Sequence, residues 1–145
     1  MRTDENMVAT ERTVISAEGA LALIGAAQRA AAAEGMAVSI CVVDPSGLQV
    51  GFLRMDGAML GTIALAATKA HSAAMFATPT HAWHGILSGD AALRDGLLGT
   101  DRFTTLGGGV PLVAGGTLIG ALGVSGGSVD QDRAVAEAAA AEVVG

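Results

Sequence analysis

Apolar residues recur at helical spacing in three long segments of the chain, and shorter apolar segments lie between them. The first long segment, residues 17–34, carries one stripe of mostly small and apolar side chains: Leu21, Ile24, Ala27, Gln28 and Ala31. Ser16 precedes this segment as a preferred helix N-cap, and Gly35 follows it as a preferred stop. The pattern therefore predicts a helix over residues 17–34.

A hairpin and a second helix follow. Residues 38–43 (VSICVV) predict a buried strand, and the DPSG tetrapeptide after it, residues 44–47, matches a type I turn. Residues 48–55 are then expected to return as the second strand. Residues 59–77 predict a helix, which ends before Pro79 because the residue preceding a proline disfavours the helical conformation.

The second half of the chain predicts shorter elements. Thr80 is expected to cap a short helix running to Leu87, and residues 88–100 are expected to form the longest loop. Three strands are predicted over residues 102–106, 110–114 and 117–124, with Gly115 and Gly116 as a two-residue turn. Ser128 and Gln131 have the spacing of a capping box, so a last helix is predicted to run to Val144.

These elements predict an α/β (α+β) fold. Five strands and three main helices suggest a three-layer sandwich, in which a mostly antiparallel five-stranded sheet has helices on both faces. The length of 145 residues fits one domain, expected over residues 13–145 after a flexible N-terminal tail over residues 1–12.

Charge and composition argue against some classes of binding partner. The formal net charge is −6, and the eight Lys and Arg residues are dispersed, so the basic patch that nucleic-acid binding requires is missing. The N-terminus lacks the apolar region of a secretion signal, and no segment reaches the roughly 18 apolar residues of a membrane span. We therefore expect a cytoplasmic protein with no nucleic-acid or membrane partner. The single cysteine, Cys41, lies in a predicted strand, where a free thiol behaves as a small apolar side chain.

Several motifs occur in an order that resembles a known family: VVDPSG, RMDGA, TKAHSAA, GGGVPL, GALGVSGG and DQDRAVAEAA. From about Val14 to Val144 the chain resembles the GlcG/HbpS family, which includes the C-terminal domain of PduO-type proteins. The resemblance implies an antiparallel sheet covered by helices, assembly into homo-oligomers and, in several members, binding and slow degradation of haem. The separate adenosyltransferase domain of PduO-type proteins has no counterpart here, so that activity is not implied.

Three histidines are the candidate haem ligands. Haem iron takes His, Met, Cys or Tyr, and the chain has no tyrosine. His81 and His84 stand three residues apart, so both lie on one face of a helical turn, and Trp83 offers a flat surface for a porphyrin. The alternative is that both histidines are solvated in an exposed connection, and that Trp83 anchors this connection or an oligomer contact. His71 is the third candidate, and it departs from the family pattern at its position.

Anion binding is the second candidate chemistry. Lys69 is a lone lysine in an apolar helix, so it either reaches solvent or holds a buried anion. With Arg54 it could bind haem propionates or the acid group of a small substrate, although Asp56 could neutralise Arg54 instead. Lys69 and His71 lie two residues apart, roughly 200° around a helix, and cannot easily serve one pocket.

Backbone amides offer a further anion site. Ser125, Gly126 and Gly127 lead into the N-terminus of the last helix, where free amides favour anions. The alternative is that the glycines serve only turns and close packing.

The sequence thus predicts a cytoplasmic homo-oligomer that binds haem, or a similar planar anionic ligand, near a subunit interface. Such a protein could act on haem or serve as an accessory protein, so whether the chain is an enzyme stays open. The alternative is an isomerase, tautomerase or lyase acting on a carboxylate-bearing metabolite in the same pocket. Lys69, His71 and Asp56 are its candidate catalytic residues.

Overall fold

A computed structural model describes residues 8–145 of the chain. Residues 1–7 of the expected flexible tail lie outside the described residues. From Arg12 onward the chain contacts the domain: the Arg12 guanidinium donates to the Ser46 hydroxyl at 2.8 Å, and the Ile15 amide donates to the Ile119 carbonyl at 2.8 Å.

The sheet has four antiparallel strands in the order β2-β1-β4-β3. Strand β1 is Ser39–Val43, β2 is Gln49–Arg54, β3 is Gly109–Ala114 and β4 is Thr117–Ser125. The antiparallel arrangement confirms the prediction. The predicted turn at residues 44–47 joins β1 to β2, and the predicted turn at residues 115–116 joins β3 to β4. Four strands rather than five form because residues 102–106 are irregular.

The missing strand has a physical explanation at the edge of the sheet. The outer edge of β3 is already occupied, because the Gly109 amide donates to the Thr80 hydroxyl at 2.9 Å. Pro111, two residues further on, has no amide proton to offer a neighbouring strand. The first half of the β3 edge therefore offers residues 102–106 no free amide to pair with.

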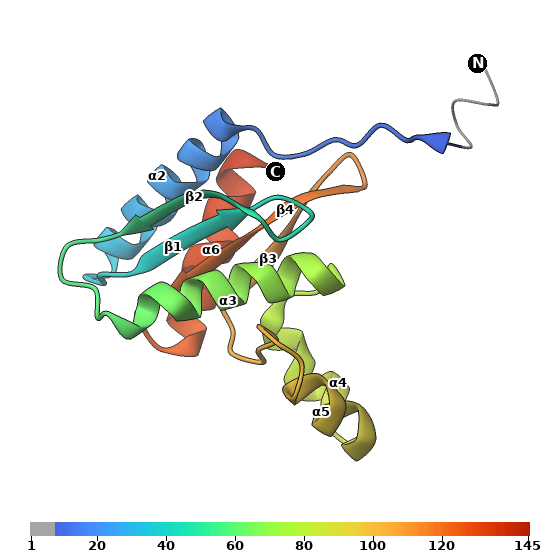
Figure 1. Cartoon of the computed structure of the whole chain (residues 1–145). Coiled ribbons are helices and arrows are strands. Elements are labelled where there is room, and N and C mark those ends of the chain that lie inside the picture. The colour runs from blue at the N-terminus through green and yellow to red at the C-terminus, as the bar shows by residue number, and fades with distance from the viewer. Residues whose placement is uncertain (1–7) are drawn as a thin grey trace.

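Helices cover both faces of the sheet and complete the three predicted layers. Helices α2 (Ala17–Ala33) and α6 (Val129–Val143) lie on one face, and α3 (Gly61–Phe76) lies on the other (Figure 1). The α2/α6 face contains the larger aliphatic side chains of the core, among them Leu23, Ile40, Leu112, Leu122 and Val135. The α3 face is built from small side chains: Cys41, Ala66, Ala70, Ala73 and Ala121.

Local capping signals are confirmed, but one predicted stripe is rotated. The Ser16 hydroxyl accepts the Gly19 amide at the start of α2, and Ser128 and Gln131 form a reciprocal capping box at the start of α6. In α2, however, Leu21 is 68% exposed and Gln28 is also exposed. The buried stripe consists instead of Ala20, Leu23, Ile24, Ala27 and Ala31.

Glycines let α3 lie directly on the sheet. A Cβ atom at Gly123 would collide with the Ala66 carbonyl oxygen and would lie 2.6 Å from the Ala70 amide nitrogen. A Cβ at Gly109 would likewise collide with the Lys69 carbonyl. Both glycines are therefore required for the close approach of a helix backbone to the sheet.

A helical arm projects from the body (Figure 1). It comprises the short 3-10 helix η1 (Thr80–Ala82), α4 (Trp83–Leu87) and α5 (Ala91–Leu98). A short helix over residues 80–87 was predicted, but Thr80 does not cap it, because its hydroxyl binds Gly109 instead. The predicted loop over residues 88–100 is wrong: Asp90 caps α5 by accepting the Leu93 amide at 3.0 Å.

Across residues 8–145, no helix combines the length and the apolar character needed to cross a membrane.

Candidate functional site

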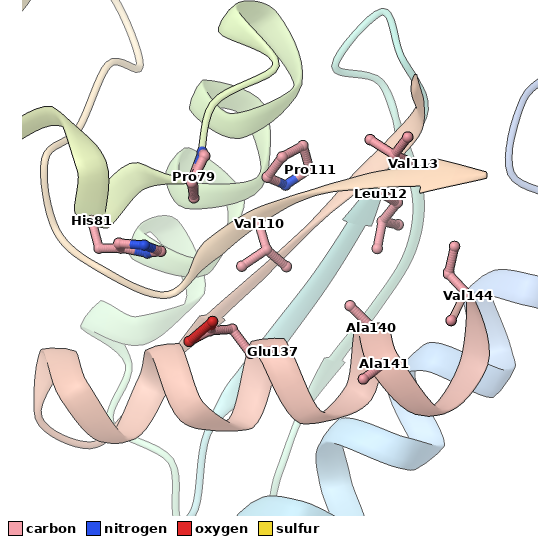
Figure 2. A pocket seen from close by; sticks show the side chains of 11 residues that line it. Pro79, His81, Val110, Pro111, Leu112, Val113, Glu137, Ala140, Ala141 and Val144 are labelled. Atoms are coloured by element: carbon pink, nitrogen blue, oxygen red, sulfur yellow. The ribbon is translucent and has the colours of Figure 1, made fainter. Parts of the chain in front are cut away.

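Two neighbouring hollows meet at His81. The first, here called the β3–α6 groove, has a volume of about 450 Å³ and lies between β3 and the C-terminal half of α6. Its walls are mostly apolar, with Val110 and Leu112 on the strand and Ala140 on the helix. Figure 2 shows His81 and Glu137 on the same side of this groove, His81 from the arm and Glu137 from α6. The groove is thus apolar along its length and polar at one end.

The second hollow, here called the histidine hollow, has a volume of about 420 Å³. His81 and His84 line it from the base of the arm, and Asp130 and Arg133 line it from the first turns of α6. Thr105, Leu106, Gly107 and Val129 complete its surface. The structure therefore brings His81 and His84 to one surface, as their spacing of three residues requires, and adds a cationic side chain opposite them.

The surroundings of His81 lower the pKa of its imidazole. Burial lowers its pKa below the usual 6.5, the Arg133 guanidinium lowers it further, and the Glu137 carboxylate acts in the opposite direction. Arg133 itself donates to Glu137, with 2.8 Å between Nε and Oε1. The His81 Nδ1 atom is buried and has no hydrogen-bond partner among the described residues. A neutral imidazole is the form that can ligate a metal.

Trp83 is not available as a flat surface for a ligand. The indole is only 8% exposed, and the edges of Phe76 and Phe103 pack against it, with ring centroids 5.4 and 5.1 Å away at steep interplanar angles. This aromatic cluster attaches the arm to α3 and to residues 99–108. The alternative interpretation of Trp83 as an anchor is therefore the one the structure supports.

His71 lies apart from the two histidines of the hollow. It does not line the histidine hollow or the β3–α6 groove. Its ring packs against the turn at Gly47, where an added Cβ would lie 2.7 Å from the ring. Burial and the nearby Arg102 guanidinium lower the pKa of His71, partly offset by Asp101.

Lys69 holds a buried anion, and that anion belongs to the chain itself. The ammonium is 2% exposed and donates to Asp132 Oδ2 at 3.0 Å and to the Val124 carbonyl at 2.9 Å. It points away from His71, as the helical spacing predicted. Because its charge is already neutralised, Lys69 does not offer a free ammonium to a ligand carboxylate.

The expected backbone anion site is filled by the same carboxylate. Asp132 accepts the Gly127 amide at 2.8 Å and the Gly126 amide at 3.4 Å. Ser125, just before them, is buried at the end of β4. The amides that favour an anion are present, but the anion is the Asp132 side chain.

Arg54 and Asp56 do not join Lys69 at a common pocket. Both are exposed, at the end of β2 and in the turn after it, and neither lines either hollow. The expected pairing of Arg54 with Lys69 around one carboxylate is therefore not what the structure shows. Asp44 accepts the Ser46 and Leu48 amides at 2.8 and 3.1 Å and stabilises the turn between β1 and β2.

Arg133 and Glu137 are the site residues that sequence reasoning missed. They stand four residues apart in the last helix, inside the motif DQDRAVAEAA, which was interpreted only as a family signature. Their spacing places both on one face of the helix. The sequence could therefore predict that Arg133 and Glu137 share a helix face. It could not predict that β3 and residues 105–107 lie beside this face and complete the hollows.

The side chains of the histidine hollow suit a metal that is bound in a cofactor, which supplies most of the metal's ligands. Residues 8–145 contain no group of three His, Cys, Asp or Glu side chains that could hold an ion. Two histidines beside an arginine instead match an iron whose porphyrin supplies the equatorial nitrogens and carries propionates. The residues present fit haem on these grounds.

Comparisons with known proteins find the same fold and a family to which the chain belongs. The family model "Haem degrading protein HbpS-like" matches residues 15–141. Corrinoid adenosyltransferase PduO of Citrobacter freundii is 41% identical over 108 residues, which cover 73% of this chain and 32% of PduO, about a third of its length. The structure of an HbpS double mutant from Streptomyces reticuli matches with a TM-score of 0.86 and 33% identity, covering 99% of this chain and 94% of HbpS. A PduOC–haem complex matches with a TM-score of 0.80 and 36% identity, covering 89% and 94% of the two chains.

Proposed function

Because the chain belongs to the HbpS-like family, as its motifs suggested, we propose that it binds haem in the histidine hollow. His81 is the proposed axial ligand and His84 the second candidate, with Arg133 placed to bind a propionate. The observation that carries the proposal is the meeting of two histidines and one arginine at a single hollow of about 420 Å³.

The chemistry of each residue supports its role. The lowered pKa of His81 favours the unprotonated imidazole, the form that can ligate iron. Arg133 can bind a carboxylate with two parallel hydrogen bonds, and its partner Glu137 is a half-exposed surface residue. The structural relative PduOC, crystallised as a haem complex, adds support from the same fold.

The size of the hollow supports a site that is completed by a second copy of the chain. Its volume is at the lower end of the range of roughly 300–1,000 Å³ for pockets that bury most of a drug-sized ligand. The outer face of α3 also exposes apolar side chains, among them Ile63, Leu65 and Met75. We therefore propose a homo-oligomer.

The alternative small-molecule enzyme gains no support from the geometry. Its candidate residues Lys69, His71 and Asp56 lie in a buried ion pair, against a turn and on an exposed loop, respectively. None of the three lines the β3–α6 groove or the histidine hollow.

Titration of the purified protein with hemin tests the proposal. We expect a saturable shift of the Soret band, weakened at least tenfold by His81→Ala. The matched control is His71→Gln, which removes a histidine that does not line the hollow and should leave the titration unchanged. Absence of any Soret shift with the wild-type protein at stoichiometric concentration would refute haem binding. Decay of the Soret band after addition of a reductant and oxygen would show degradation as a separate step.

A further inference from the structure

We propose that Glu137 is a positioning residue for His81: it accepts the Nδ1–H of that imidazole when haem binds, after exchanging its present partner Arg133 for the histidine. This inference rests on the proposed function and assigns a role to a residue that touches neither the iron nor the porphyrin. Figure 2 shows Glu137 projecting from α6 toward the side of the groove on which His81 lies.

The unpartnered Nδ1 atom of His81 is the starting observation. Because Nδ1 is buried, Nε2 is the ring nitrogen left to face a ligand. A neutral imidazole that ligates through Nε2 carries its proton on Nδ1, and a buried N–H without an acceptor is unfavourable. Histidines that bind metals almost always donate this second N–H to a carboxylate, a carbonyl or water. His81 as an iron ligand therefore requires an acceptor on its Nδ1 side.

Glu137 is the acceptor that the site offers. It is the one carboxylate side chain among the described residues that line the β3–α6 groove, and the other side chains lining the groove beside His81 are apolar. Arg133 lines the histidine hollow beside His81 but has only donors, and Asp130, which also lines that hollow, is not among the charges that act on the His81 imidazole. The charge of Glu137 already acts on His81, since it opposes the effect of Arg133 on the imidazole.

Haem binding supplies the reason for the exchange of partners. Arg133 donates to Glu137 at 2.8 Å, and their side chains are 45% and 49% exposed, so this pair contributes little and separates easily. Arg133 also lines the histidine hollow, where a propionate would attract it. Once Arg133 turns to the propionate, the Glu137 carboxylate has lost its partner and His81 offers it a new one.

The exchange predicts an electronic effect on bound haem. An imidazole that donates to a carboxylate is a more basic ligand, and a more basic ligand favours ferric over ferrous iron. Glu137→Gln should therefore weaken hemin binding by roughly 10- to 100-fold, the usual effect of losing such a partner. It should also lower the ratio of ferric to ferrous affinity about tenfold, which raises the midpoint potential by about 59 mV for one electron.

The experiment compares four proteins by hemin titration and by spectroelectrochemistry of the bound haem. These are the wild type, Glu137→Gln, Arg133→Gln and Glu142→Gln. Glu142 lies on the same helix in an exposed pair with Arg29 and lines neither hollow, so its variant should match the wild type in both measurements. Arg133→Gln should weaken binding, through loss of the propionate contact, while leaving the potential near the wild-type value.

Each outcome decides between the steps. If Glu137→Gln leaves affinity and potential unchanged, the positioning role is wrong while haem binding stands. If Arg133→Gln raises the potential as much as Glu137→Gln, breaking the surface pair explains both effects, and the exchange is wrong. If His84→Ala abolishes the Soret shift and His81→Ala does not, the ligand is His84 and the inference fails. If the wild type shows no Soret shift, the proposed function fails first and the inference fails with it.

Discussion

The buried ion pair between Lys69 and Asp132 gives the sharpest prediction about stability. The substitution is Lys69→Met, which removes the ammonium and keeps an apolar chain of similar length. The two side chains are 2% and 3% exposed, so water cannot replace the lost partner. Breaking a buried pair by removing one member costs about 3–5 kcal/mol of unfolding free energy, because a charge stays buried without compensation.

The contacts place the two single variants at different ends of that range. After Lys69→Met, Asp132 still accepts the Gly127 amide at 2.8 Å and the Gly126 amide at 3.4 Å, so we expect a loss of about 3 kcal/mol. After Asp132→Leu, the ammonium keeps only the Val124 carbonyl at 2.9 Å, so the loss should be about 5 kcal/mol. The double variant Lys69→Met with Asp132→Leu removes both charges and should recover most of the stability.

Urea unfolding followed by circular dichroism measures all three variants and yields their coupling energy. The matched control is the same cycle on Arg29 and Glu142, whose atoms lie only 2.7 Å apart but whose side chains are 67% and 57% exposed. That surface pair should give a coupling of about 0–1 kcal/mol. A loss below about 1 kcal/mol for Lys69→Met, or equal couplings for the two pairs, would refute the reasoning, because the ammonium would then be hydrated in solution.

Three further predictions follow from single positions. Gly123→Ala should lower the free energy of unfolding by about 1–3 kcal/mol, because the added Cβ would force α3 away from the sheet. The control Gly96→Ala, on the open surface of α5, should raise it by roughly 0.4–1 kcal/mol. Equal effects in urea unfolding would contradict the close approach of α3 to the sheet. Burial raises the pKa of the Cys41 thiol to about 11, so at pH 8 an aromatic disulfide reagent should label this thiol only as fast as the chain unfolds. Rapid labelling of the native protein would show that the α3 face is open to solvent. The pKa of His71 in the folded state lies below its usual 6.5, so between the two pKa values the unfolded chain binds more protons and the free energy of unfolding should fall as pH decreases. His71→Gln should reduce this dependence of stability on pH, measured by urea unfolding at several pH values. An unchanged pH dependence would mean that other groups cause it.

The local parts of the fold were predictable because their causes are local. Ser16 and Gly35 bound α2, and the Gly47 amide donates to the Asp44 carbonyl at 2.9 Å in the predicted turn. Each of these signals acts over no more than a few residues, so a single sequence contains all the information needed.

The two errors in secondary structure depend on context instead. Helix α5 (AALRDGLL) is short and includes a glycine, so its periodicity is weak, and the Asp90 cap was the one usable signal. The expected strand over residues 102–106 has a plausible composition, but a strand needs a free edge. The edge of β3 is blocked at Gly109 by Thr80, a residue about twenty positions away, and no local pattern records this contact.

The candidate site was predictable only where its members are neighbours in sequence. His81 and His84 share one helical turn, whereas Arg133 and Glu137 reach them only because β3 and α6 pack side by side. The partner of Lys69 lies 63 residues further along the chain. A lone lysine in an apolar helix did predict a buried anion, but it could not say whether the anion came from a ligand or from the protein.

The buried ion pair also connects the core to the candidate site. Asp132 holds the N-terminus of α6 against Lys69 on the opposite face of the sheet and against the end of β4. Arg133 is the next residue, and Glu137 follows one turn later. The contacts that hold Asp132 therefore also fix the direction in which both side chains leave the helix. The glycine amides and the lysine therefore serve ligand binding without touching a ligand. They hold in place the helix whose next turn carries the arginine and the carboxylate that His81 needs.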